Sequence, residues 1–141
     1  MPLQIVLDTN VLVSGLRSQR GASYRLLQML NDPRWQINLS TTLLLEYEDV
    51  LKRPGMIPGL SHQAIDIFLD GVCAIANRQS IFYLWRPLAN DPKDDFLLEL
   101  AVRSQADFLI TYNKRDLRAA SIFNIALSTP KEFLEAVGEL T

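Results

Sequence analysis

The sequence predicts a doubly wound α/β domain with a parallel central sheet of four or five strands. Short apolar runs alternate along the chain with longer segments whose apolar residues recur at helical spacing. The apolar runs lack the in–out alternation of half-exposed strands, which is typical of strands that helices bury on both faces. The run Leu3-Gln4-Ile5-Val6-Leu7 is the clearest example, and it stops at Asp8.

Six segments carry the helical period, and most of them are bounded by start or stop signals. The third helix begins at a cap, Ser40 or Thr41, the fourth begins at Ser61, and the fifth begins at Asp91 with Pro in the first helical position. The sixth begins with a capping box at Thr129. In chain order, the predicted helices cover residues 11–17, 23–30, 42–53, 62–77, 93–105 and 130–137.

Four apolar runs between these helices are predicted strands, and a fifth run is weaker. In chain order, they cover residues 3–7, 35–39, 80–84, 107–110 and, more weakly, 122–127. In sheets of this kind, ligands bind outside the carboxyl ends of the strands. Asp8 and the polar loop after Ile110 are therefore expected at the functional edge. Asp8 and Asn10 are alternatively ordinary N-caps of the next helix, and the triplet alone leaves both interpretations open.

The composition is that of a globular chain of 141 residues, which we expect to form one domain over residues 1–141. The formal charge of −2 gives no overall basic field for nucleic acid, although acids that hold metal and bases that hold phosphate would cancel in the total. The single His62 excludes mechanisms that need two histidines, and the single Cys73 excludes a disulfide framework. No membrane span or secretory signal is expected, which favours a cytoplasmic location.

Carboxylates without an obvious structural role are the candidates for a functional site. Glu48 and Asp49 each have a basic partner four residues on, whereas Glu46 borders the apolar stripe of its helix and has no local cation. Asp94 lies on the helix face that must pack on the sheet, and Asp95 is a near alternative. Acids in a first helical turn also suit the helix dipole, so a purely structural role stays open for both.

The loop after the fourth predicted strand carries Thr111, Asn113 and Asp116 together, although Asn and Asp are also ordinary turn formers. With the acids above, this loop completes a set of hard oxygen donors, which selects Mg²⁺ or Mn²⁺. Such metals polarise a phosphodiester and activate water, and two metals about 4 Å apart stabilise attacking and leaving oxygens together. The set comprises Asp8, Glu46, Asp94 and Asp116.

Four motifs follow one another along almost the full chain. They are Asp8-Thr9-Asn10-Val11-Leu12, Glu46 with Tyr47, Asp91-Pro92-Lys93-Asp94-Asp95, and Ala106-Asp107-Phe108-Leu109-Ile110-Thr111 followed by Asp116. As an ordered set they resemble the PIN domain, the nuclease fold common among bacterial and archaeal toxin–antitoxin ribonucleases. The resemblance implies a three-layer α/β/α sandwich and metal-dependent endoribonuclease activity on RNA.

The resemblance also assigns roles to individual residues. It places the family acids, which would hold Mg²⁺ or Mn²⁺, at Asp8, Glu46, Asp94 and Asp116, with Asn10 and Thr111 as supporting hydrogen-bonding groups. Many relatives carry Asp where this chain has Asn113, which can ligate through its carbonyl but adds no charge. The number of metals, one or two, therefore stays open.

Partners follow from the same resemblance. It implies an RNA substrate, a cognate antitoxin protein and, as is frequent in the family, a homodimer, although the sequence identifies no interface. Lys114, Arg115 and Arg17 follow the acidic loops and are expected to hold the RNA backbone without reading its sequence. Solvated surface is the alternative for each of these bases.

Two other functions compete with the ribonuclease. A receiver or aspartyl-phosphatase domain is disfavoured because Asn10 stands where the phosphatase motif needs Asp. A weakly active or inactive PIN-like scaffold that binds RNA or protein is favoured by Asn113 and opposed by the four acids.

Overall fold

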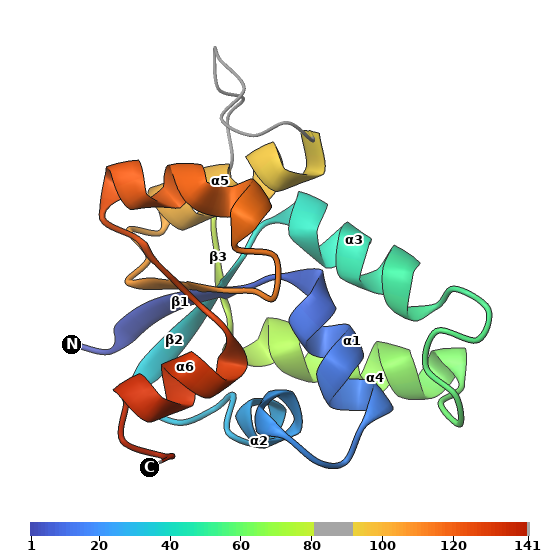
Figure 1. The fold of residues 1–141 in the computed structure, drawn as a ribbon. Coiled ribbons are helices and arrows are strands. Elements are labelled where there is room, and N and C mark those ends of the chain that lie inside the picture. Colours follow the sequence, from blue (N-terminus) through green and yellow to red (C-terminus); the bar gives the residue numbers. More distant parts are fainter. Residues whose placement is uncertain (81–91, 141) are drawn as a thin grey trace.

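Five parallel strands form the central sheet, in the order β3-β2-β1-β4-β5 (Figure 1). The structure is a computed structural model that describes residues 1–80 and 92–140. All four pairings between the strands are parallel, as the sequence predicted. The strands are β1 (Leu3–Leu7), β2 (Trp35–Leu39), β3 (Asn77–Arg78), β4 (Phe108–Ile110) and β5 (Ala126–Ser128).

Helices cover both faces of the sheet, which confirms the predicted three-layer sandwich. In Figure 1, α5 (Pro92–Arg103) and the 3-10 helix η1 (Arg115–Phe123) lie above the sheet. Below it lie α2 (Ala22–Gln28), α4 (His62–Ile75) and α6 (Pro130–Ala136). The remaining helices, α1 (Thr9–Arg17) and α3 (Thr41–Leu51), start at the carboxyl ends of β1 and β2. None of the described helices has the length and apolar character needed to cross a membrane.

The strand β1 lies at the centre of the sheet, and its side chains form the middle of the hydrophobic core. Ile5 and Val6 are fully buried, as is Leu109 on the neighbouring strand β4. Removing such a side chain from water contributes about 1.5–3 kcal/mol to folding. The aromatic ring of Phe133 packs edge-on against Trp35 and Phe108, which fixes α6 against the sheet. The core therefore holds the carboxyl ends of β1, β2 and β4 in fixed positions.

The prediction of a strand over residues 122–127 was wrong over most of its length. Helix η1 continues to Phe123, and Asn124 ends it in the left-handed conformation with φ of 60°. A residue in that conformation cannot continue a strand, so β5 begins only at Ala126. Ile122 and Phe123 are exposed apolar residues, which gave the sequence its misleading strand pattern.

A short strand, β3, precedes the stretch that was predicted as the third strand. Helix α4 ends at Ile75, where Ala76 already has extended backbone angles, and β3 pairs with the end of β2 from Asn77. The helix predicted to residue 77 is therefore two residues too long. The strand predicted over residues 80–84 lies outside the described residues except for Ser80, and the predicted cap Asp91 lies outside them too.

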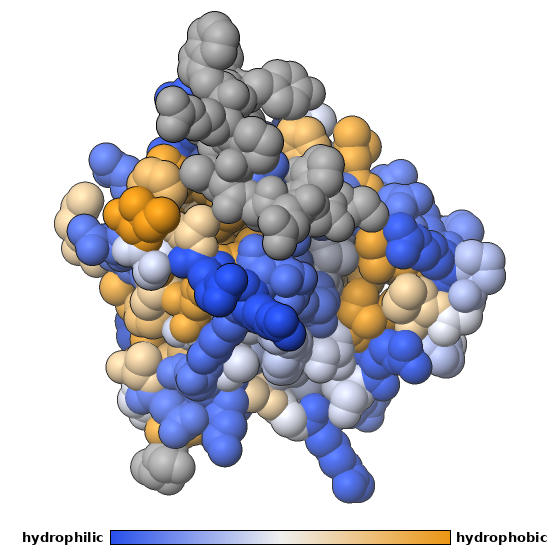
Figure 2. Space-filling view, turned by 45° about the horizontal axis from the view of Figure 1, so that its top comes forward, coloured by the Kyte–Doolittle hydropathy of each residue, from blue (hydrophilic) through white to orange (hydrophobic). Residues whose placement is uncertain are grey.

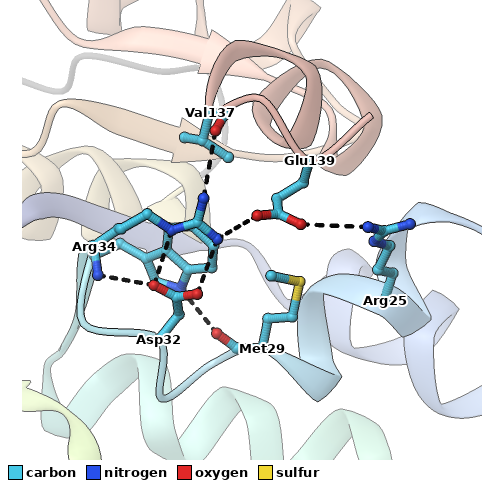
Figure 3. Close-up of polar contacts among 7 residues, drawn as sticks. Arg25, Met29, Asp32, Arg34, Val137 and Glu139 are labelled. Atoms are coloured by element: carbon cyan, nitrogen blue, oxygen red, sulfur yellow. Dashed lines mark hydrogen bonds and ion pairs between the residues drawn. The ribbon is translucent and has the colours of Figure 1, made fainter. Parts of the chain in front are cut away.

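A network of ion pairs fastens the C-terminal segment after α6 to the body of the domain (Figure 3). Arg34 lies between Asp32, at 2.9 Å, and Glu139, at 2.5 Å, and its guanidinium stacks over the ring of Trp35. The second carboxylate oxygen of Glu139 pairs with Arg25 of α2 at 3.3 Å. This network lies on the loop that precedes β2, away from the carboxyl edge of the sheet.

Candidate active site

Asp8 lies at the carboxyl end of β1, at the edge that the fold reserves for ligands. It occupies the N-cap position of α1, but within this fully described helix its side chain makes no capping hydrogen bond. Its Oδ2 atom instead accepts hydrogen bonds from Thr111 Oγ1 at 2.7 Å and from Asn10 Nδ2 at 3.3 Å. The sequence left open whether Asp8 is a functional acid or an ordinary N-cap. In the structure, its side chain does not cap the helix.

Thr111 brings the end of β4 to Asp8. Because Leu7 pairs with Ile110 in the sheet, the residues that follow them in the chain lie side by side. Thr111 is fully buried, and its hydroxyl also accepts a hydrogen bond of 2.8 Å from the backbone N–H of Asn113. The hydroxyl hydrogen is thus directed to Asp8, and the loop after β4 is tied to the same oxygen.

Glu46 reaches the same edge from α3. Its Oε2 atom accepts a hydrogen bond of 2.5 Å from the hydroxyl of Thr9, a buried residue in the first turn of α1. The next residue, Tyr47, is fully buried and donates its hydroxyl to the carbonyl of Leu7 at 2.5 Å, which fastens α3 to the end of β1. Sequence reasoning missed this role of Thr9; the available signal was its position directly after Asp8, at the end of β1.

The two carboxylates influence each other electrostatically. Burial raises the pKa of Asp8 above its ordinary value, the hydrogen bond from Thr111 opposes that shift, and the negative charge of Glu46 adds to it. Burial, followed by the charges of Asp8 and Glu46, also raises the pKa of Tyr47 well above 10.0. Tyr47 therefore stays a neutral hydrogen-bond donor, and the two acids place negative charge side by side at this edge of the sheet.

Asp94 and Asp95 lie in the first turn of α5 and are both half-buried. A pocket of about 260 Å³ separates this part of α5 from α3 and is lined by Glu46, Phe96 and Leu97, among others. Asp94 lies three residues before Leu97, a spacing that puts both on one face of the helix. The first turn of α5 is thus brought towards Glu46, in agreement with the arrangement of α3 and α5 in Figure 1.

Asp116 follows the loop after β4 and bonds a residue of that loop. It is exposed, and its Oδ2 atom accepts a hydrogen bond of 3.0 Å from Asn113 Nδ2. Among residues 1–80 and 92–140, no three His, Cys, Asp or Glu side chains are close enough to hold a metal ion together. Asp8 and Glu46 act on each other electrostatically, whereas no three of the four predicted acids come together among the described residues.

The bases predicted to hold RNA differ in their surroundings. Lys114 forms an ion pair with Glu132 of α6, which holds the pKa of that carboxyl down at about 2. Arg115 is exposed at the start of η1, directly before Asp116. Arg17 lies in the last turn of α1, so the helix places it about 13 Å from Asp8 along the axis. Arg115 is therefore the exposed base on the loop that contacts Asp8.

The donor set fits a small, hard cation. Asp8 and Glu46 supply carboxylate oxygens, and the neighbouring donors are hydroxyl and amide groups. Mg²⁺ is usually bound by one or two carboxylates and completes its shell with waters and substrate phosphates, so two acids are sufficient. Figure 2 shows hydrophilic side chains in the middle of the face seen there, with hydrophobic clusters on either side.

Comparisons with known proteins agree with this fold. Residues 4–115 match the family described as PIN domain. Among solved structures, the chain is similar to a chain of the VapBC2 complex from Rickettsia felis, crystallised with a DNA fragment from its promoter. The likeness has a TM-score of 0.62 and 15% sequence identity and covers 90% of this chain and 98% of that chain. At this identity, it concerns the fold alone. The comparison with curated proteins found no match.

Proposed function

Because this chain belongs to the PIN domain family, with the match spanning residues 4–115, we propose that it is a divalent-metal-dependent endoribonuclease. The observation that carries the proposal is the pair Asp8–Glu46. Two acids far apart in sequence meet at the carboxyl edge of the sheet, and the charge of one raises the pKa of the other. Such a pair is costly without a cation and well suited to one.

In this proposal, Mg²⁺ or Mn²⁺ is held directly by Asp8 and Glu46, with Asp94, or its neighbour Asp95, and Asp116 as further acids around it. The bound ion polarises the phosphodiester and makes water a better nucleophile near neutral pH. The chain's own part is to fix the acids: Thr111 and Asn10 orient Asp8, and Thr9 orients Glu46.

Arg115, Lys114 and Arg17 hold the RNA backbone in this proposal. Their contacts would go to phosphate oxygens, which fix the position of the strand and carry no base sequence. Arg115 contributes most, because Lys114 already pairs with Glu132 and Arg17 lies at the far end of α1. Asn113 adds no charge to the pocket, so the proposal does not require a second metal.

The proposed biological role is that of the toxin in a toxin–antitoxin pair, with a cognate antitoxin protein and a homodimeric state as in many members of the family. Membership of the PIN family and the likeness in fold to a chain of the VapBC2 complex support this role. Induction of the gene without its antitoxin should then slow growth. Induction of the Asp8→Asn variant should not.

A cleavage assay tests the enzymatic proposal. Wild-type protein with Mg²⁺ or Mn²⁺ should cleave an unstructured RNA, and EDTA, Asp8→Asn and Glu46→Gln should each abolish the cleavage. The matched control is Glu48→Gln, which changes an acid on the same helix whose partner is Lys52. Binding of RNA without any metal-dependent cleavage would favour the scaffold, for which the structural argument is that no three acids come together among the described residues.

A further inference from the structure

Tyr112 is an exposed aromatic residue directly beside the candidate active site. It follows Thr111 at the carboxyl end of β4, and 48% of its surface is exposed. Its backbone N–H donates a hydrogen bond of 3.3 Å to Asn10 Oδ1, and Asn10 in turn bonds Asp8. Two hydrogen bonds therefore connect Tyr112 to the carboxylate of Asp8.

The ring of Tyr112 is held at both ends. Its backbone is fixed by Asn10, and its hydroxyl hydrogen-bonds the hydroxyl of Ser23 in the first turn of α2. Ser23 is only 3% exposed, so the bond anchors the tip of the ring to the body of the domain. A ring fixed in this way loses little conformational entropy when a flat ligand stacks on it.

We propose that Tyr112 is a stacking platform for an unpaired base of the RNA substrate, next to the nucleotide whose phosphate lies at Asp8. The proposal rests on the proposed ribonuclease function and adds to it a contact between Tyr112 and a base of the substrate. Proteins that bind unpaired strands place exposed aromatic rings along a phosphate-binding site, and each stacked base contributes about 1–3 kcal/mol. A base within a duplex presents only its edges and cannot stack in this way.

A purely structural role for Tyr112 makes a different prediction. If the residue only tethers the loop after β4 to α2, the bond to Ser23 matters and the face of the ring does not. Tyr112→Phe and Ser23→Ala both remove that bond and keep the ring, whereas Tyr112→Leu removes the ring as well. Tyr112→Trp keeps a stacking face without the hydroxyl. These four variants separate the ring from the tether.

The test is the affinity for an unstructured RNA oligonucleotide, measured by fluorescence anisotropy in the Asp8→Asn background, which blocks the proposed cleavage and removes a charge that repels RNA. Tyr112→Leu should weaken binding by about 5- to 150-fold, the factor equivalent to one stacked base. Tyr112→Trp, Tyr112→Phe and Ser23→Ala should bind within a few-fold of the background protein. Phe123→Leu, which removes an exposed ring at the far end of η1, is the matched control and should bind as the background does.

Oligonucleotides with one abasic position complete the test. At one position, loss of the base should weaken binding to the protein that has Tyr112. The same loss should not weaken binding to Tyr112→Leu any further, as expected when the base and the ring contact each other. Equal affinity of Tyr112→Leu and the background protein would overturn the stacking proposal. Equal weakening at every abasic position in both proteins would also overturn it. Both results leave the ribonuclease proposal standing if the wild type cleaves RNA, whereas absence of any RNA binding overturns both proposals.

Discussion

The hydroxyl of Thr111 donates a 2.7 Å hydrogen bond to Asp8 Oδ2, and the two residues are 103 positions apart in the chain. The contact exists because β1 and β4 are adjacent parallel strands whose carboxyl ends coincide. The Thr111 hydroxyl oxygen also accepts a hydrogen bond from the backbone N–H of Asn113. The hydroxyl hydrogen is therefore the one that Thr111 donates to Asp8. These hydrogen bonds therefore fix the orientation of the Asp8 carboxylate.

Thr111→Val should reduce metal affinity and cleavage by about 10- to 100-fold, the usual effect of losing a group that orients a metal ligand. Valine has nearly the same shape, so the loss reports the hydroxyl. Thr111→Ser keeps the hydroxyl and serves as the control. The measurement is the Mn²⁺ concentration needed for half-maximal RNA cleavage. An unchanged concentration in Thr111→Val would contradict the role of Thr111 in orienting a metal ligand.

Asp8→Asn should stabilise the protein in EDTA at neutral pH. The folded state raises the pKa of Asp8 above 3.8, so ionisation of Asp8 opposes folding. This cost is absent below pH 3.8, grows as the pH rises through the raised pKa, and is fully present above it. The free energy of unfolding should therefore favour Asp8→Asn at pH 7, with a difference that shrinks towards pH 4.

Urea unfolding of the two proteins at several pH values measures that difference, with Glu48→Gln as a surface control. Saturating Mg²⁺ should stabilise the wild type and have less effect on Asp8→Asn, because ligands stabilise the state that binds them. A wild type that is more stable than Asp8→Asn in EDTA at pH 7 would contradict the electrostatic account.

Tyr47→Phe should lower the free energy of unfolding by about 1–3 kcal/mol, because it leaves a buried carbonyl of Leu7 without its hydroxyl donor. The ring itself is retained, so no cavity forms. Tyr112→Phe is the matched control: its hydroxyl also makes one hydrogen bond, but the side chain is half exposed and the loss should be smaller. Urea denaturation of both variants gives the comparison, and equal effects would contradict it.

Arg115→Gln should weaken RNA binding more than Lys114→Gln does. A phosphate contact made by Arg115 releases counterions, so its loss should reduce the slope of log affinity against log salt by about 1. Lys114 already has its charge opposed by Glu132, and the slope should change less. Arg53→Gln, which removes the partner of Asp49 near the end of α3, is the control. A larger effect at Lys114 would show that RNA displaces Glu132.

The sequence predicted the parts of the site that depend on strand ends and helix faces. Asp8 ends a buried strand, and Glu46 borders an apolar stripe without a local cation; both features follow from the chain itself. The position of Asp116 could not be predicted in this way. Its carboxylate accepts a hydrogen bond from the amide of Asn113. This contact depends on the local path of the loop rather than on the residue types.

The contacts that hold the site were also beyond the sequence. Thr9, Tyr47 and Ser23 act through partners 37, 40 and 89 positions away, and no local spacing identifies such pairs. The error at residues 122–127 has a different cause. One residue in the left-handed conformation, Asn124, ended a helix where apolar content favoured a strand.

Binding of Mn²⁺, followed by electron paramagnetic resonance of the free ion, tests most directly whether Asp8 and Glu46 form a metal centre. The wild-type protein should bind Mn²⁺, and Asp8→Asn and Glu46→Gln should each weaken that binding by more than about 10-fold. Glu48→Gln, two residues along the same helix, should bind as the wild type does. Equal Mn²⁺ affinity in all four proteins would contradict the account.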